Sequence, residues 1–218
     1  MGCSVVVGVE YENYEGYIKN LDEFAKSVLV ETFNIGASRA ADALSEMTGL
    51  TVNITVPEID ITPIKSVPEK VGEDIKIAVY IQLSGGFNGH AFFFMDFKDA
   101  LTMFDLMMGM SPGSTTKFDE IVQSAVMEAG NILISAFANA LSEFLGTEIN
   151  QTPPNLAIDF PPAILDFALA DIGQHCDYTM LLKTQMTVEG VEFREHFMIL
   201  PHPFSMKKII DTLLEGFV

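Results

Sequence analysis

Apolar residues recur at helical spacing over the first strongly patterned stretch of the chain, residues 20–48. Their intervals, between three and seven residues, are close to helical spacing. Asn20 can cap the start of this helix, with Glu23 at the third position inside it. Gly49 follows the run, as a glycine does at a helix C-terminus. We therefore predict one long amphipathic helix. Its apolar positions are Phe24, Val28, Ile35, Ala40, Leu44 and Met47.

Strand patterns follow this helix. Alternating β-branched residues over 51–61 predict a strand, in which Pro57 favours an edge or a bulge. The apolar runs 75–83 and 89–97 flank the turn sequence SGGFNG and predict a hairpin. A shorter helix at about 98–108 completes this half of the chain, and a loop rich in proline and lysine separates the first strand from the hairpin.

A similar order of elements follows a linker. Residues 109–118, GMSPGSTTKF, have the composition of a connecting segment. Thr116, with Asp119 three residues later, is predicted to cap a second long helix that reaches about Leu145. The remaining expected elements are a strand in 155–160, a strand pair (178–188 and 191–200) joined through Glu189-Gly190, and a last helix over 204–214.

The sequence ALSE occurs at 43–46 and again at 140–143, and each copy is followed three residues later by glycine. Both halves therefore read as long helix, strand, hairpin and short helix. We predict an α+β fold made by a pseudo-two-fold duplication of an α-β-β-β-α unit, with a mostly antiparallel sheet covered by helices. Because each half has only about 100 residues, the two are expected to share one core.

The expected domain organisation follows from this duplication. Residues 1–19 form an N-terminal tail, and residues 20–218 form a single domain. Within that domain the repeats span 20–109 and 116–215, joined by the linker described above.

Composition limits the classes of partner and compartment. The chain of 218 residues is 49% hydrophobic and 19% charged, which suits a folded domain with a sizeable core. Two cysteines make no disulfide framework, and the apolar runs are too short for a membrane span, so a cytoplasmic protein is expected. The net charge of −18 disfavours nucleic acid and anionic membranes as partners.

Polar residues form a stripe along the first long helix and recur, unchanged, 97 positions later. Such a stripe can simply be a solvated helix face. However, serine and asparagine are poorer helix formers than glutamine or lysine, so their repetition indicates a function. Gly130 costs a further ~1 kcal/mol in a helix and suggests a close approach, by a partner or by a packed helix. The matched positions are Ser27, Glu31, Asn34, Ser38 and Ser45, and then Ser124, Glu128, Asn131, Ser135 and Ser142.

The arrangement Ser-x3-Glu-x2-Asn, followed after 22 residues by proline, occurs twice, ending at Pro57 and at Pro154. With the runs NIGASRAADALS and EAGNILISAFANALSEFLG, it resembles the CheC-type phosphatases of chemotaxis, the CheC, CheX and FliY group. The resemblance covers residues from about 20 to 214. The length of the chain leaves no room for the extra C-terminal domain of FliY-type switch proteins, which favours a free-standing, two-site CheC-like protein.

The resemblance implies hydrolysis of the aspartyl phosphate on the response regulator CheY, without a covalent phosphatase intermediate. Asn34 and Asn131 would hold the attacking water in line, and Glu31 and Glu128 would pair with a lysine of the regulator. The chain would need no cofactor of its own, because the Mg²⁺ belongs to the regulator. The implied partner-binding residues are Ser27, Ser124, Ser38, Ser135 and Gly130, and the motif-closing residues are Pro57 and Pro154.

Other functions remain open. A non-catalytic adaptor of the same fold could bind the regulator or a CheD-like receptor deamidase, and a purely structural repeat protein is a third possibility. The glycines of SGGFNGH lack the Gly-Lys-Ser/Thr of a phosphate loop. The histidines His90, His175, His196 and His202 are scattered in sequence, and His175-Cys176-Asp177 lacks a second ligand cluster, so no metal site is expected.

Overall fold

A computed structural model of the chain describes residues 23–175, 177–193 and 195–215; the proposed Asn20 cap and residues 1–19 lie outside this part. The first half contains α2 (Glu23–Thr48), β1 (Val52–Pro63), the short helices η1 (Ile64–Ser66) and α3 (Val67–Val71), β2 (Lys76–Gly85), β3 (Gly89–Met95) and α4 (Phe97–Met107). The second contains α5 (Glu120–Leu145), β4 (Ile149–Gln151), β5 (Asn155–Asp159), α6 (Pro161–Gly173), β6 (Tyr178–Val188), β7 (Val191–Phe193), β8 (Glu195–Pro201) and α7 (Pro203–Glu215).

The strands form two antiparallel sheets whose pairings interleave the halves. In the smaller sheet, β6 lies between β1 and β7, so the first strand of one half pairs with the second half. In the larger sheet, β4 and β5 of the second half both pair with β2 of the first half, which is the reciprocal arrangement. β3 pairs with its counterpart β8 at the junction of the halves. These reciprocal pairings are those of a pseudo-two-fold duplication, so the predicted α+β fold is confirmed.

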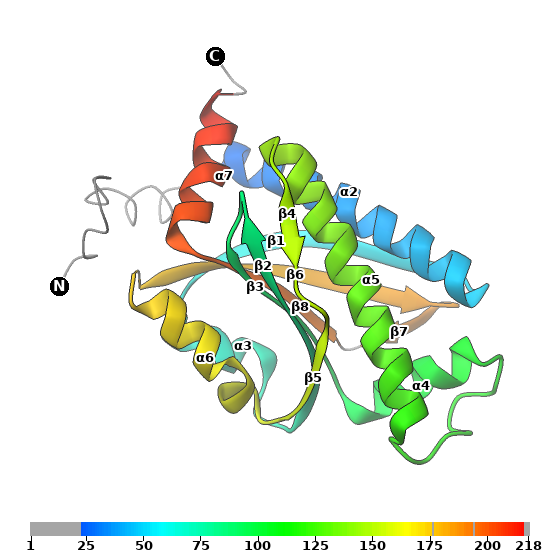
Figure 1. Cartoon of the computed structure of the whole chain (residues 1–218). Helices are drawn as coiled ribbons and strands as arrows, with labels where there is room; N and C mark the ends of the chain where they lie inside the picture. The colour runs from blue at the N-terminus through cyan, green and yellow to red at the C-terminus, as the bar shows by residue number, and fades with distance from the viewer. Residues whose placement is uncertain (1–22, 176, 194, 216–218) are drawn as a thin grey trace.

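Helices cover the sheets on both sides (Figure 1). The larger core lies beneath α2, α4, α5 and α7, and the smaller core lies beneath α3 and α6 on the opposite face. The run AFFFM in β3 supplies both cores, since Phe93 faces the larger one while Phe92 and Phe94 face the smaller one. A strand buried on both faces needs such a continuous apolar run, because successive side chains point to opposite sides.

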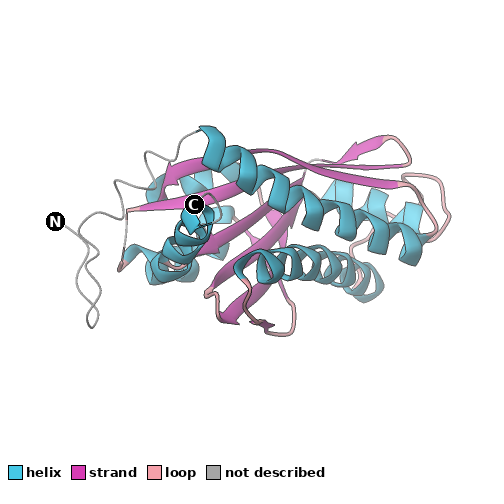
Figure 2. Cartoon of the chain, turned by 90° about the horizontal axis from the view of Figure 1, so that it is seen from above, coloured by secondary structure: helices cyan, strands magenta, loops and turns pink. Residues whose placement is uncertain are grey.

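The two long helices lie side by side over the strands (Figure 2). A Cβ atom added to Gly36 of α2 would lie 3.1 Å from the Phe137 Cα and the Ala140 Cβ of α5, so the helix backbones approach closely here. Among the described helices, α5 alone has the length and apolarity that a membrane span would need. Its inward face is buried against the sheet and α2, as expected of a core helix.

Helices lie in two segments for which none was predicted. The segment after β1, predicted as a loop, contains η1 and α3, and α6 begins 97 residues after the start of η1. Pro161 and Pro162 occupy the first turn of α6. Proline is tolerated there because an N–H group in the first turn has no acceptor within the helix. The second strand pair also differs from expectation. β6 and β7 meet at the predicted Glu189-Gly190 turn, but β8 joins β3 in the other sheet.

The start of α5 and the segment before it depend on two aspartates. The cap is Asp119, whose Oδ1 accepts hydrogen bonds from the N–H groups of Ile121 and Val122 at 3.1 and 3.2 Å, so the prediction of Thr116 is wrong by three residues. The buried Asp105 carboxylate accepts bonds from the N–H groups of Gly113, Ser114 and Thr115 at 2.7 to 2.9 Å. It thereby fixes the segment between α4 and α5.

We expect Asp105→Asn to make the free energy of unfolding less dependent on pH in acid. Hydrogen bonds from the Thr115 hydroxyl and from the three N–H groups hold the pKa of Asp105 below its ordinary value. The stability supplied by the carboxylate is therefore complete above about pH 4 and is lost as the pH falls through the folded-state pKa. Urea unfolding at a series of pH values measures this, with Asp42→Asn on the exposed face of α2 as the matched control. Equal pH dependence in parent and Asp105→Asn would contradict the assignment.

Candidate functional site

The repeated polar stripe lies on the accessible faces of α2 and α5. Glu31 and Glu128 are exposed, whereas Asn34 and Asn131, each one turn further along, are half-buried. Residues three apart on a helix are neighbours on its surface, so each helix presents a carboxylate beside a carboxamide. The serines that precede the glutamates, Ser27 and Ser124, are exposed, as is Ser38. The side chains of both Glu-Asn pairs are therefore accessible and not enclosed in the core.

Both motif prolines lie at the same irregularity in strand pairing. In β1 the register with β6 shifts by one residue between Thr55 and Glu58, which places Pro57 in a bulge. In the second half the register with β2 shifts equally between Gln151 and Asn155, around Pro154. A bulge leaves backbone groups unpaired and suits a proline, which has no N–H to donate. The structure thus confirms the prediction of an edge or a bulge at Pro57, since β1 is an edge strand with a bulge there.

The Asn34 carboxamide is hydrogen-bonded to the bulge in β1. Its Oδ1 accepts from the Val56 N–H at 2.9 Å, and its Nδ2 donates to the Val56 carbonyl at 3.0 Å. Nδ2 also donates to the Val30 carbonyl at 3.0 Å. Asn34 therefore satisfies the backbone groups that the bulge frees and joins α2 to β1.

The equivalent Asn131 has different surroundings. Within the described ranges, no residue forms a hydrogen bond with its side chain, although it lies at the same place in the repeat. The residue 97 positions after Val56 is Pro153, which cannot donate a backbone hydrogen bond. The Pro153 carbonyl instead accepts from Asn155 Nδ2 at 3.2 Å.

Several repeated serines have structural contacts. Ser27 and Ser124 donate to carbonyls of the preceding helical turn, Phe24 and Glu120 respectively, at 2.7 and 2.9 Å. Ser135 donates to Gln151 Oε1 at 2.9 Å. The last pair acts at the helix ends: Ser45 Oγ accepts from the Val52 N–H at 3.0 Å, and Ser142 Oγ donates to the Thr147 carbonyl at 2.5 Å. The recurrence of Ser45 and Ser142 is thus explained by the return of the chain to the sheet.

Gly130 does not contribute to a partner-binding surface. It is buried, and a Cβ atom added there would lie 2.7 Å from Val79 Cβ and Cγ2 in β2. The close approach predicted at this glycine is therefore an internal contact between α5 and the sheet. The expectation that Gly130 binds a partner is wrong, because the sheet occupies the space beside it.

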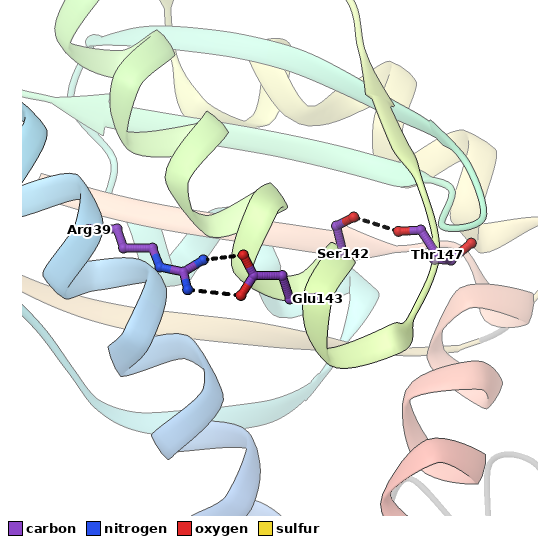
Figure 3. A network of polar contacts seen from close by, with 4 residues as sticks. All are labelled: Arg39, Ser142, Glu143 and Thr147. Carbon is purple, nitrogen blue, oxygen red and sulfur yellow. Dashed lines mark hydrogen bonds and ion pairs between the residues drawn. The ribbon is translucent and has the colours of Figure 1, made fainter.

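A groove of about 520 Å³ lies on the surface along the contact between the C-terminal halves of α2 and α5. Arg39 of α2 spans it, donating from Nη1 and Nη2 to both oxygens of Glu143 of α5 at 2.7 and 2.8 Å (Figure 3). These bonds raise the pKa of Arg39 and lower that of Glu143 from their ordinary values. Ile132 and Ser135 also line the groove, so it begins next to Asn131.

Exposed apolar residues occur near both Glu-Asn pairs. Ile121 is 67% exposed one turn before Ser124, and Phe24 occupies the equivalent position in α2 at 57%. Ile35, next to Asn34, is 46% exposed. Large apolar side chains flanking polar groups are typical of protein-binding surfaces.

A second polar cluster lies on the opposite face of the sheet. The buried His90 contacts Tyr80 Oη at 3.0 Å through Nδ1 and Asp171 Oδ2 at 3.1 Å through Nε2. The rings of His175 and His202 meet edge to face, with centroids 4.6 Å apart. Burial, together with the neighbouring His175, lowers the pKa of His202. Of the residues that the structure covers, no three metal-ligating side chains converge here or elsewhere.

The two Glu-Asn pairs have a clear chemical capability. A carboxamide donates and accepts hydrogen bonds without titrating, so it can orient a water molecule. A nearby carboxylate can pair with a cation on a docking protein. Such positioning groups suit phosphoryl transfer, which needs alignment of the nucleophile more than a strong base. Because both pairs lie on exposed helix faces, they are accessible to a protein that docks there.

Comparison with known proteins agrees with this geometry. A model of the CheC-like family matches residues 24–63 and 121–158, which contain both Glu-Asn pairs and both motif prolines. The CheY-P phosphatase CheC of Bacillus subtilis is 23% identical over 199 residues, covering 88% of this chain and 95% of that protein. The flagellar motor switch phosphatase FliY of the same organism is 28% identical over 142 residues, which cover 65% of this chain and 37% of FliY.

The solved structures include a relative with the same fold. The crystal structure of Thermotoga maritima FliY matches with a TM-score of 0.72 and 27% identity, covering 90% of this chain and 98% of that one. The family match lies on both repeats, and the structural match covers 90% of this chain. The chain therefore resembles the CheC-like family over both repeats and shares the fold of this FliY structure.

Proposed function

We propose that this protein is a cytoplasmic phosphatase that hydrolyses the aspartyl phosphate of a CheY-like response regulator. The main support is that both halves present an accessible carboxylate and carboxamide, one helical turn apart, beside an equivalent bulge. Relatives named CheY-P phosphatase CheC and flagellar motor switch phosphatase FliY support a phosphatase activity of this kind. The exposed apolar residues near both pairs suit a docking surface for the regulator.

In the proposed reaction, the regulator docks on α2 or α5, and the glutamate pairs with a lysine next to the phosphorylated aspartate. The asparagine orients a water whose oxygen attacks the phosphorus. The bond between phosphorus and the aspartate oxygen breaks, the regulator regains its carboxylate, and the oxygen and both protons of the water leave as part of inorganic phosphate. The Mg²⁺ that neutralises the phosphoryl oxygens belongs to the regulator.

The test measures loss of phosphate from a phosphorylated CheY-like regulator in the presence of this protein. The parent should accelerate the decay, and Asn34→Ala combined with Asn131→Ala should reduce that acceleration about a hundredfold, because the water is no longer held in line. Asn139→Ala, an exposed position on α5, is the matched control. A double variant as active as the parent would contradict the proposal. Binding without accelerated decay in the parent would identify an adaptor instead.

A further inference from the structure

The two candidate sites differ in how much of the asparagine side chain is available. Both N–H donors of Asn34 are engaged by carbonyls, and one lone pair of Oδ1 accepts from the Val56 N–H. A carboxamide offers two donors and two acceptor lone pairs, so Asn34 keeps one acceptor site. Among the residues that the structure describes, none forms a hydrogen bond with the donors or acceptors of the Asn131 side chain.

The sequence at the bulge explains this difference. Val56 supplies both an N–H and a carbonyl to Asn34, an arrangement that resembles a pair of residues in a sheet ladder. Pro153, at the equivalent place, has no N–H, and its carbonyl already accepts from Asn155. The second repeat therefore keeps the bulge but lacks the backbone donor that holds the first asparagine.

The orientation of Asn34 matters for catalysis as well as its occupancy. Its oxygen and nitrogen both point at Val56, towards the body of the protein. To hold a water against a docked regulator with a donor, the side chain would have to release hydrogen bonds that nothing replaces. Loss of a single net hydrogen bond already corresponds to a factor of about ten in a rate or an equilibrium.

We propose that Glu128 and Asn131 carry most of the dephosphorylation, whereas Asn34 acts mainly as a structural link between α2 and β1. Val56 and Pro153 are positioning residues: Val56 holds the Asn34 side chain, whereas Pro153 has no N–H with which to hold that of Asn131. The inference rests on the proposed function, since it assigns shares of that activity to the two sites.

Single asparagine variants test the division by two independent measurements. Asn131→Ala should lower the acceleration of regulator dephosphorylation at least tenfold, and Asn34→Ala less than about threefold per folded molecule. The order should be opposite in urea unfolding: Asn34→Ala should lower the midpoint because it leaves the Val56 N–H and carbonyl unpaired, whereas Asn131→Ala should not. A structural role for both residues would lower the midpoint in both variants.

Pro153→Val tests the cause. Because Pro153 is exposed, valine can be placed there without disturbing the core, and it restores the N–H that could capture Asn131 as Val56 captures Asn34. The acceleration should fall about tenfold without a loss of stability. Pro162→Ala, an exposed proline in the first turn of α6, controls for the removal of a proline.

The outcomes separate this inference from the proposed function. If the parent accelerates the decay and Asn34→Ala impairs it as much as Asn131→Ala, the division of labour is wrong and the function stands. Unchanged activity in Pro153→Val would overturn the role of Pro153 in the same way. If the parent does not accelerate the decay at all, the proposed function fails, and the inference fails with it.

Discussion

Replacing both Glu31 and Glu128 by lysine should weaken the binding of the phosphorylated regulator at least about a hundredfold. In the proposed complex each carboxylate pairs with a lysine of the regulator, and docking removes water from that pair. Losing such a pair costs about 2–5 kcal/mol, and an introduced lysine adds repulsion. Binding can be measured by calorimetry with the regulator held in its phosphorylated form.

A control must separate local pairing from net charge, because the parent carries −18. Glu46→Lys combined with Glu148→Lys makes the same change of charge at exposed positions near the ends of α2 and α5. This control should bind nearly as well as the parent. Raised salt should change the affinities of the two charge variants equally, because they have the same net charge. Equal affinity in the Glu31 and Glu128 variant and in the parent would remove the two glutamates from the interface.

The second large effect concerns packing. Gly130→Ala should destabilise the protein by about 1–3 kcal/mol, even though alanine is intrinsically about 1 kcal/mol better than glycine in a helix. The reason is that the new methyl group would meet the buried Val79 side chain at 2.7 Å, and the sheet behind it cannot move away freely. Urea unfolding would measure this loss of stability as a lower midpoint with an unchanged dependence of the unfolding free energy on urea concentration.

Two further variants identify the cause of that loss. Gly173→Ala, at the end of α6, places a methyl group where nothing lies within 4 Å, so it should leave the stability unchanged or slightly higher. Val79→Ala should reduce the cost of Gly130→Ala, which a double-mutant cycle would show as a coupling energy. If Gly130→Ala is as stable as the parent, the contact between α5 and β2 is not tight.

Much of the fold could be predicted because periodicity and helix-ending glycines are local signals. Gly49 and Gly146 both adopt positive φ at the ends of the long helices, as their positions suggested. No element was predicted for the segment that forms α6, although proline, here Pro161 and Pro162, is favourable in a first helical turn. The separation of β8 from β6 depends on pairing with the distant β3, which no local pattern encodes.

The candidate site was predictable in part for the same reason. The offset of 97 identified both Glu-Asn pairs and both prolines from sequence, but their roles as catalytic and binding residues remain predictions. The capture of Asn34 by Val56 depends on a contact between residues 22 apart, which only the folded chain shows. Its absence at Asn131 could have been anticipated, since Pro153 aligns with Val56.

The exchange of strands between the halves has a consequence for the origin of the molecule. A chain made of the first half alone would have its β1 without β6 and its β2 without β4 and β5. Such a chain could complete its sheets only by borrowing the missing strands from a second copy. An ancestor with a single half would thus have needed a second copy to complete its sheets, and fusion of the two halves let one Glu-Asn pair change independently of the other.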